Sequence, residues 1–387
     1  MERWETDYHW TPSQCEWTLG VGNRLNKKQG THLADALLIP PSMWRYYKRS
    51  DQESQESYTL TLIEEYIAGI NVERIPSKEF LFNPTIPRIT KSIGQLTHLQ
   101  EMLLKCTGVS EVPSEIGYLT NLERLAFNER PMTKLAEKLY KTGVINTMPI
   151  YLTHLPPDIG ELRNLEQLFI LSSLEEVPEE IGELESLEWL YLCSNKIKSL
   201  PESIGNLRNL KVLILYNNQL TELPESIGNL PELRIISASQ NKLKTLPETM
   251  GQLTNLQILI VSDNELQELP PESIPPNLRT LSVKQNKLTY LPGTIGELQR
   301  LKLLDFRWNE IKSIHPNVRQ LINCEEDYSA DINPDWMIKK PFRIPEFGYP
   351  EDDTYVYAGY NPLDGEAETI IKELQKKGIQ TDLFRKA

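Results

Sequence analysis

A phrase of 23 residues repeats along the centre of this 387-residue chain, and it limits the possible folds more than any other feature. One copy reads LPESIGNLRNLKVLILYNNQLTE, from Leu200 to Glu222. The phrase restarts at Leu223, Leu246, Leu269 and Leu291, and one copy has 22 residues. A fixed period of about 20 to 29 residues with the spacing L-x-x-L-x-L-x-x-N-x-L predicts a solenoid in which each copy forms one coil.

Each part of the phrase has a physical role. Leu213 and Leu215 alternate with period two, which predicts a short strand with one buried face. The amide of Asn218 can bond backbone groups where the chain turns away from that strand. Pro224 cannot extend a ladder, and Gly228 suits a tight turn. The structural asparagine ladder predicted from this spacing consists of Asn195, Asn218, Asn241, Asn264, Asn286 and Asn309. A single coil cannot cover its own leucines, so neighbouring coils must stack.

The order Leu-Pro-x-x-Ile-Gly-x-Leu-x-x-Leu with its downstream asparagine resembles the leucine-rich repeat family. Within it, the 23-residue length resembles the Ras-suppressor-like and plant intracellular Ras-group class. The resemblance implies an α/β solenoid: a horseshoe with a parallel concave β-sheet, irregular or 3₁₀ convex arcs, and caps at both ends. It says little about ligands, because members of the family bind very different partners.

Three segments interrupt or flank the repeats. Residues 1–88 are rich in tryptophan and tyrosine, which favours an N-terminal cap or a separate binding module; within them, 58–75 fits a degenerate first repeat or a short helix. Repeats are expected over 89–322, with an insert at 131–154 that lies on the binding face or is a tolerated surface excursion. Residues 323–387 predict a C-terminal cap with a terminal helix, or a segment with an independent function.

Strand positions between the buried leucines face outward on the concave side, and many of them are apolar. A contiguous exposed apolar patch usually marks an interaction site, with Trp and Tyr as favoured anchors. The predicted partner-binding residues are Phe169, Trp189, Tyr191, Val212, Ile214, Tyr216, Ile235, Ile258 and Ile260, with a polar flank of Lys284, Asp305, Arg307 and Trp308. Two alternatives stay open: strands favour Val, Ile and Tyr anyway, or a terminal segment of the same chain covers the patch.

Charge and cysteine content narrow the classes of partner and compartment. The net charge of −13 argues against DNA or RNA as the main partner, because phosphate contact needs a concentrated basic surface. The four cysteines include no C-x-x-C pair, which favours free thiols in a reducing compartment. The polar, acidic start of the chain does not read as a signal, and no apolar run is long enough to span a bilayer. We therefore expect a cytoplasmic protein without a membrane span.

No motif indicates catalysis. The five histidines lack metal-ligand spacing, and there is no G-x-S-x-G and no phosphate-binding glycine loop. Cys324 resembles the cysteine of bacterial leucine-rich repeat effectors that carry a ubiquitin-ligase domain, but only 63 residues follow it. We expect no catalytic residue, no metal site and no cofactor.

The sequence thus predicts a protein–protein interaction scaffold or adaptor that binds a protein or peptide on its concave face, and we expect it to act in intracellular signalling. The family resemblance makes a small GTPase or a signalling enzyme a conceivable partner. The alternatives are a recognition module of an effector-type system, or an enzyme that uses the C-terminal tail.

Overall fold

A computed structural model describes residues 79–82, 89, 91–105, 109–128, 151–322 and 354–382, apart from single positions within them. The chain divides into two compact units, Met1–Ser77 and Lys78–Ala387, and all of the described residues belong to the second. The expected first repeat at 58–75, most of the insert at 131–154, and residues 323–353 lie outside the described ranges.

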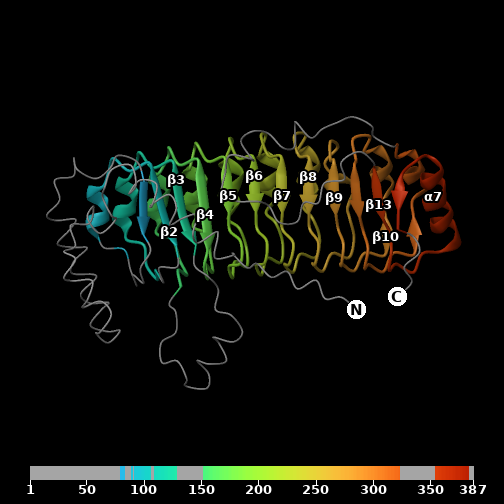
Figure 1. Ribbon diagram of the computed structural model, residues 1–387, viewed down its shortest axis with the longest axis horizontal. Helices are drawn as coiled ribbons and strands as arrows, with labels where there is room; N and C mark the ends of the chain where they lie inside the picture. The colour runs from blue at the N-terminus through green and yellow to red at the C-terminus, as the bar shows by residue number, and fades with distance from the viewer. Residues whose placement is uncertain are drawn as a thin grey trace, which may run out of the picture. The chain divides into compact units, whose positions relative to one another are not determined.

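Twelve parallel strands form one continuous sheet in the second unit, almost in chain order (Figure 1). The strands are β1 (Glu79–Phe82), β2 (Glu101–Lys105), β3 (Arg124–Asn128), β4 (Gln167–Leu171), β5 (Trp189–Tyr191), β6 (Val212–Ile214), β7 (Ile235–Ser237), β8 (Ile258–Ile260), β9 (Thr280–Ser282), β11 (Leu303–Asp305), β13 (Tyr355–Tyr357) and β14 (Gln380–Thr381). A second, two-stranded parallel sheet pairs β10 (Tyr290–Leu291) with β12 (Ser313–Ile314).

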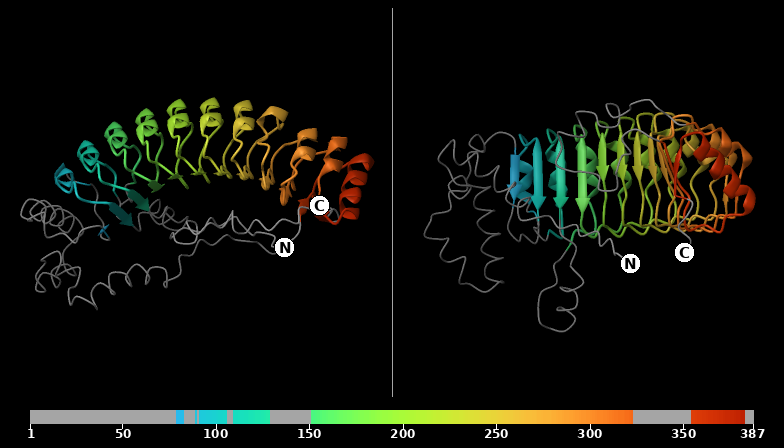
Figure 2. Two further views of the ribbon diagram at one scale, coloured as in Figure 1. Left: turned by 90° about the horizontal axis from the view of Figure 1, so that it is seen from above. Right: turned by 45° about the vertical axis from the view of Figure 1, so that its right-hand side comes forward.

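Short 3₁₀ helices form the opposite side of the coils. They are η3 (Lys91–Gln95), η4 (Ser114–Tyr118), η5 (Pro157–Glu161), η6 (Glu179–Glu183), η7 (Glu202–Asn206), η8 (Glu225–Asn229), η9 (Glu248–Gln252), η10 (Pro271–Ser273), η11 (Gly293–Glu297) and η12 (Pro316–Gln320). The sheet lines the inside of a curve and these helices line the outside (Figure 2). The predicted horseshoe-like α/β solenoid is therefore confirmed.

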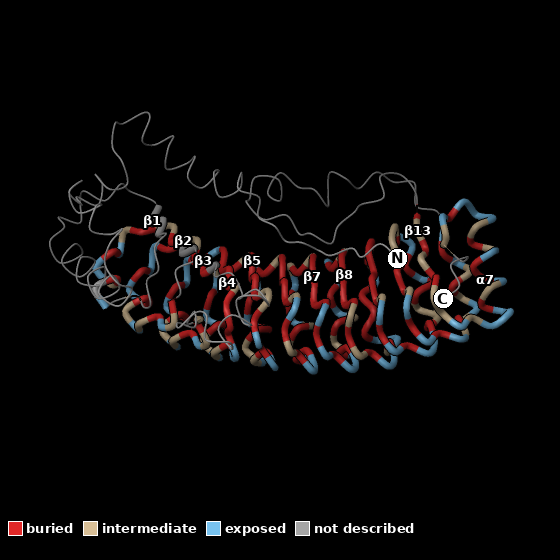
Figure 3. The backbone as a smooth tube through the Cα atoms, turned by 60° about the horizontal axis from the view of Figure 1, so that its bottom comes forward, coloured by how far each residue is buried: buried red, intermediate tan, exposed pale blue. Residues whose placement is uncertain are grey.

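The repeat residues explain this coil. Leu207, Leu213 and Leu215 are fully buried between the two sides, and exposed residues gather along the outer arcs (Figure 3). Pro201 precedes η7 with φ −70° and ψ 152°, an extended geometry that its ring favours and that starts the 3₁₀ turn. Because each coil buries its leucines only against its neighbours, stability comes from stacking.

Glycine is required where successive 3₁₀ helices approach each other. A Cβ built on Gly228 would lie 2.4 Å from the carbonyl oxygen of Thr249, and one on Gly251 would lie 2.0 Å from that of Glu272. A backbone oxygen cannot move aside as a flexible side chain can. The Ile-Gly pair of the repeat therefore reflects close packing between coils.

The asparagine side chains connect consecutive coils. Asn218 Nδ2 donates to the carbonyl of Leu192 in the preceding coil (2.6 Å) and to that of Leu215 in its own (3.0 Å), while its Oδ1 accepts from the N–H of Ile197 (3.2 Å). All six predicted ladder residues make such bonds and are 7–8% exposed. They satisfy buried backbone groups at the turn after each strand.

The sheet starts earlier in the chain than the recognisable repeats do. β1 pairs in register with β2, Glu79 opposite Glu101, although the leucine pattern begins only at Ile89. Farther along, Arg124 in β3 pairs directly with Gln167 in β4, so the chain between these adjacent strands is about one coil longer than elsewhere.

The C-terminal residues form a further coil. β13 pairs with β11, and Asn361 Nδ2 donates to the carbonyls of Phe306 and Ala358 (both 2.9 Å), as the ladder asparagines do. Helix α7 (Gly365–Lys376) follows; Asp364 caps it by accepting from the N–H of Ala367 (2.8 Å). No helix of the described residues is long and apolar enough to cross a membrane.

Candidate functional site

The strand register places the predicted concave residues in two parallel columns. In the first, Trp189 lies opposite Val212, Val212 opposite Ile235, and Ile235 opposite Ile258. In the second, the order is Phe169, Tyr191, Ile214, Ser237, Ile260, Ser282 and Asp305. Adjacent parallel strands lie about 4.8 Å apart, so neighbours within a column can touch.

These columns form one apolar cluster that is separate from the leucine core; we call it the concave cluster. Its members are Ala126, Phe169, Trp189, Tyr191, Val212, Ile214, Ile235, Ile258 and Ile260, with Cys193 and Tyr216 packed against it. The ring centroids of Phe169 and Tyr191 are 5.1 Å apart, and those of Trp189 and Tyr191 are 6.4 Å apart with nearly parallel planes. Nine of the thirteen predicted binding residues are thus brought together.

The concave cluster is buried, which corrects the expectation of an exposed patch. Trp189 is 2% exposed, Tyr191 5%, and Val212 is fully buried. Strand spacing alone shows which positions face away from the leucine core but not whether they are covered. Trp189, Tyr191 and Tyr216 also take part in further polar or ring interactions, so none of them is a free group.

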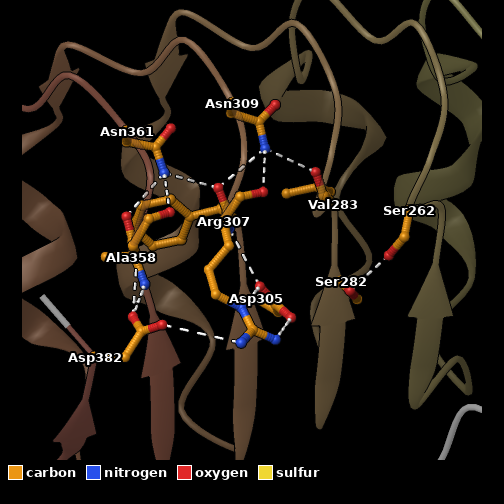
Figure 4. Close-up of polar contacts among 11 residues, drawn as sticks. Ser262, Ser282, Val283, Asp305, Arg307, Asn309, Ala358, Asn361 and Asp382 are labelled. Carbon is orange, nitrogen blue, oxygen red and sulfur yellow. Dashed lines mark hydrogen bonds and ion pairs between the residues drawn. The ribbon is translucent and has the colours of Figure 1, made fainter. Parts of the chain in front are cut away.

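The polar flank forms a separate cluster at the C-terminal end of the face. Arg307 donates from Nε to Asp305 Oδ1 (2.9 Å) and from Nη2 to Asp305 Oδ2 (2.6 Å) (Figure 4). Its guanidinium lies 4.4 Å from the ring centre of Tyr357. Asp382 lies 4.0 Å from Nη1 and accepts from the N–H groups of Ala358 and Gly359. The bond to Asp305 raises the pKa of Arg307, and burial raises the pKa of Tyr357. This arrangement fixes a charged pair in place.

The last two predicted residues lie elsewhere. Trp308 follows β11 in a left-handed turn (φ 58°), stacks on Tyr360 and is 47% exposed, so it stands at the edge of the sheet and not on the face. Lys284 lies close enough to Asp263 to lower its pKa, against the larger opposite effect of burial. Neither joins the concave cluster.

The sequence analysis missed four residues of the last coil: Tyr357, Tyr360, Asn361 and Asp382. One signal could have found three of them. Val356, Ala358 and Asn361 repeat the spacing of Leu304, Phe306 and Asn309. The small alanine hid that pattern. Asp382 has no signal of this kind, because it is brought in by the strand after α7.

No group of three or more His, Cys, Asp or Glu side chains within the described ranges could hold a metal ion. Ser262 and Ser282, whose hydroxyl oxygens lie 2.7 Å apart between the two clusters (Figure 4), bond each other. The described face therefore combines a buried apolar cluster with a few fixed polar groups.

Two family descriptions match the regular coils. Residues 170–234 and 203–274 match the model of a "Leucine-rich repeat region", and residues 254–311 match that of a "Leucine rich repeat". No curated protein matches the chain.

Many solved structures share the fold. An internalin, InlF of Listeria monocytogenes, is 18% identical, with a TM-score of 0.52, over 77% of this chain and 73% of its own. A chain of the TLR13–ssRNA13 complex is 19% identical, with a TM-score of 0.53, over 81% of this chain but only 40% of its own. A leucine-rich repeat protein of Leptospira interrogans is 22% identical, with a TM-score of 0.40, over 80% of this chain and 90% of its own. At these identities the likeness to the internalin and to the TLR13 chain concerns the fold alone.

Proposed function

We propose that this leucine-rich repeat protein is a non-catalytic binding module that recognises a protein or peptide partner with its concave cluster. One observation carries the proposal: nine apolar side chains, two of them the rings of Trp189 and Tyr191, form a continuous cluster on the side of the sheet that faces away from the leucine core. These side chains are additional to the residues that fill the inside of the coils.

The chemistry of the cluster suits a polypeptide. Trp and Tyr are the residues most often found to carry binding energy in protein interfaces, and they do so when fully desolvated. The Asp305–Arg307 pair at one end supplies a fixed polar boundary, as interface rims commonly do. The net charge of −13 favours a protein over a nucleic acid as the partner.

The proposal also includes the cellular location of the protein and the class of its partner. The 23-residue repeat length supports a place in the Ras-suppressor-like or plant intracellular class, a cytoplasmic location, and a small GTPase or signalling enzyme as partner. The absence of C-x-x-C pairs supports the same compartment. An effector-type recognition module fits the same face. Catalysis by the C-terminal tail is supported by no observation on the described residues.

The burial of the cluster sets a condition on binding. Because Trp189 and Val212 are already covered, a partner must replace contacts that these side chains make in the free protein. The free energy of binding then equals only the difference between the contacts made with the partner and those lost from the free protein. We therefore expect a partner with its own apolar anchor.

The test compares two tyrosine substitutions. Tyr216 packs against the concave cluster and is half-buried, whereas Tyr118 lies on η4 and is 64% exposed. The binding partner is first isolated on the immobilised wild-type protein and identified by mass spectrometry; calorimetry then gives its Kd. Tyr216→Ala should weaken binding at least about tenfold, equal to about 1.4 kcal/mol.

Tyr118→Ala should leave the Kd unchanged, because it removes the same side chain from the convex side. Circular dichroism and the unfolding midpoint of both variants establish that the fold is retained. Equal Kd values for both variants and wild type would contradict binding at the concave cluster.

A further inference from the structure

A row of residues with left-handed backbone runs along the edge of the sheet, one residue before each ladder asparagine. They are Ser194, Asn217, Gln240, Asp263, Gln285, Trp308 and Tyr360, with φ between 54° and 62°. The first five are polar. The last two, which follow the paired strands β11 and β13, are large aromatic residues, and this breaks the pattern.

The two aromatic residues are costly at these positions. A bulky non-glycine residue with positive φ is an outlier, and such strain costs on the order of 1–3 kcal/mol. Trp308 does not recover this by burial, because 47% of it stays exposed. Its ring stacks on Tyr360, with centroids 3.6 Å apart and planes 10° apart. A stack of this kind offsets about 0.5–1.5 kcal/mol.

The backbone holds both rings in a fixed position. The N–H of Trp308 donates to the carbonyl of Gly359 (3.2 Å). Asn309 and Asn361, which follow the two aromatic residues, donate to backbone carbonyls of the preceding coil and of their own coil. The pair is therefore a preorganised surface that needs little ordering when a ligand binds.

The pair lines a shallow depression of about 570 Å³. Its other lining residues are Gln285, Asn286, Asn309 and Glu310. The amides of Asn286 and Asn309 are used in the ladder. The groups left to meet a ligand are the two rings, the Gln285 amide and the Glu310 carboxylate.

The charge of the depression is negative. Glu310 is exposed and has no ion-pair partner among the residues that the structure describes. Two basic side chains nearby in sequence are already paired: Lys287 with Glu265 (2.9 Å) and Arg307 with Asp305 (2.6 Å). None of the six lining residues is basic.

We propose that this edge depression binds an arginine side chain of a basic polypeptide segment. A guanidinium is planar and weakly hydrated, stacks on aromatic rings and pairs with a carboxylate, which are the two groups present here. The site is distinct from the concave cluster, and it can bind a segment of the same partner or another one. The competing reading is that the stack only fastens the last coil to the one before it.

The test uses protein labelled with 5-fluorotryptophan, in which the ¹⁹F resonance of Trp308 is identified by its loss in Trp308→Phe. N-acetyl-arginine N-methylamide is titrated into the full-length protein, followed by its neutral citrulline analogue at the same ionic strength. We expect the arginine probe to shift the Trp308 resonance with an affinity at least about fivefold tighter than that of the citrulline probe.

Glu310→Gln should reduce the affinity of the arginine probe at least about threefold. Glu297→Gln, which makes the same charge change on the exposed convex helix η11, should leave it unchanged. Equal shifts by the two probes, no shift by either, or equal losses in the two variants would each overturn the proposal. Both substitutions are at exposed positions, so folding is retained. Because the concave cluster takes no part, failure here leaves the proposed function standing.

Discussion

The coil at Leu200–Glu222 and the coil formed by residues 354–382 share the turn after the strand but differ in the outer arc. Asn218 and Asn361 donate to the same three positions: a carbonyl of the preceding coil and the carbonyls three and two residues before them. The outer sides differ. After Asn218 the chain forms the 3₁₀ helix η8, whereas after Asn361 it forms the α-helix α7. Both coils have an asparagine at the turn after the strand, whereas the outer arc can form a 3₁₀ helix or an α-helix.

Stacking explains the difference in the arcs. In the centre each arc has a neighbour on both sides, and the backbone oxygen of Thr249 leaves no room for a Cβ at Gly228. In the last coil no atom lies within 4 Å of a Cβ built on Gly365. The wider α-helix fits only where a neighbouring coil does not crowd it; on its covered side, α7 bonds η12 through Arg319 and Glu373 (2.8 Å).

The largest expected effect is a difference in the loss of stability when the ladder residues Asn241 and Asn361 are each replaced by alanine. Asn241→Ala leaves the buried N–H of Leu220 without its acceptor, while the carbonyls of Leu215 and Ala238 each lose one donor and keep the amide of Asn218 or Asn264. At about 1–3 kcal/mol for the unsatisfied N–H and about 1 kcal/mol for each further hydrogen bond lost, we expect a loss of about 3 kcal/mol in the free energy of unfolding. Asn361→Ala, at a half-buried end coil, should cost less than half as much. Urea denaturation followed by circular dichroism measures both, and equal losses would break the comparison.

The next effect is a difference in stability between a substitution in the central arc, at Gly228, and one in the last arc, at Gly365. Gly228→Ala should destabilise the protein by about 1–3 kcal/mol, because the new methyl group meets a backbone oxygen. Gly365→Ala should leave stability unchanged or raise it by up to about 1 kcal/mol, because alanine is the better helix former and the site is open. Thermal unfolding of the two variants checks this. A destabilising Gly365→Ala would show that the last coil is as crowded as the others.

A smaller effect concerns the side-chain cap of α7 in the last coil. Asp364→Ala removes the bond from the N–H of Ala367 and should cost about 1 kcal/mol. The loss should be local, so that amide hydrogen exchange accelerates in α7 but not in the central strands. Asp364→Asn, which keeps the acceptor, should restore most of the protection. Uniform acceleration along all coils would instead show that the end coil unfolds together with the rest.

The smallest effect is a pH dependence of stability that comes from Asp263, one of the residues with left-handed backbone along the edge of the sheet. Burial raises the pKa of Asp263 above its ordinary 3.8, and Lys284 opposes this less strongly. Between 3.8 and the raised value the folded state holds more protons than the unfolded state, so this carboxyl lowers stability as pH rises through that range and keeps it lower at neutral pH. Asp263→Asn, which also suits a left-handed turn, should raise stability at pH 7 by a few tenths of a kcal/mol. The gain should shrink as pH falls toward 4; a constant gain would rule out the titration.

The sequence predicted the fold and the register of the central coils but not what surrounds them. The spacing of Leu213, Leu215 and Asn218 determines strand, turn and stacking, because each role depends on local periodicity. It could not show that Trp189 is buried, because the spacing within one coil shows only which strand positions face away from the leucine core. Asn361 was missed because its coil lacks the leucines, and Trp308 was placed on the concave face because a strand pattern does not show where the strand ends.

The most direct test of the proposed function is photo-cross-linking from the concave cluster. A photo-reactive phenylalanine analogue replaces Tyr216 in one protein and Tyr118 in another, both are irradiated in native extract, and the products are mapped by mass spectrometry. The account predicts cross-links from position 216 to a second protein, with none to that protein from position 118. Cross-links from position 216 that stay within the chain, with no second protein attached, would contradict it and show that this face serves the chain's own packing.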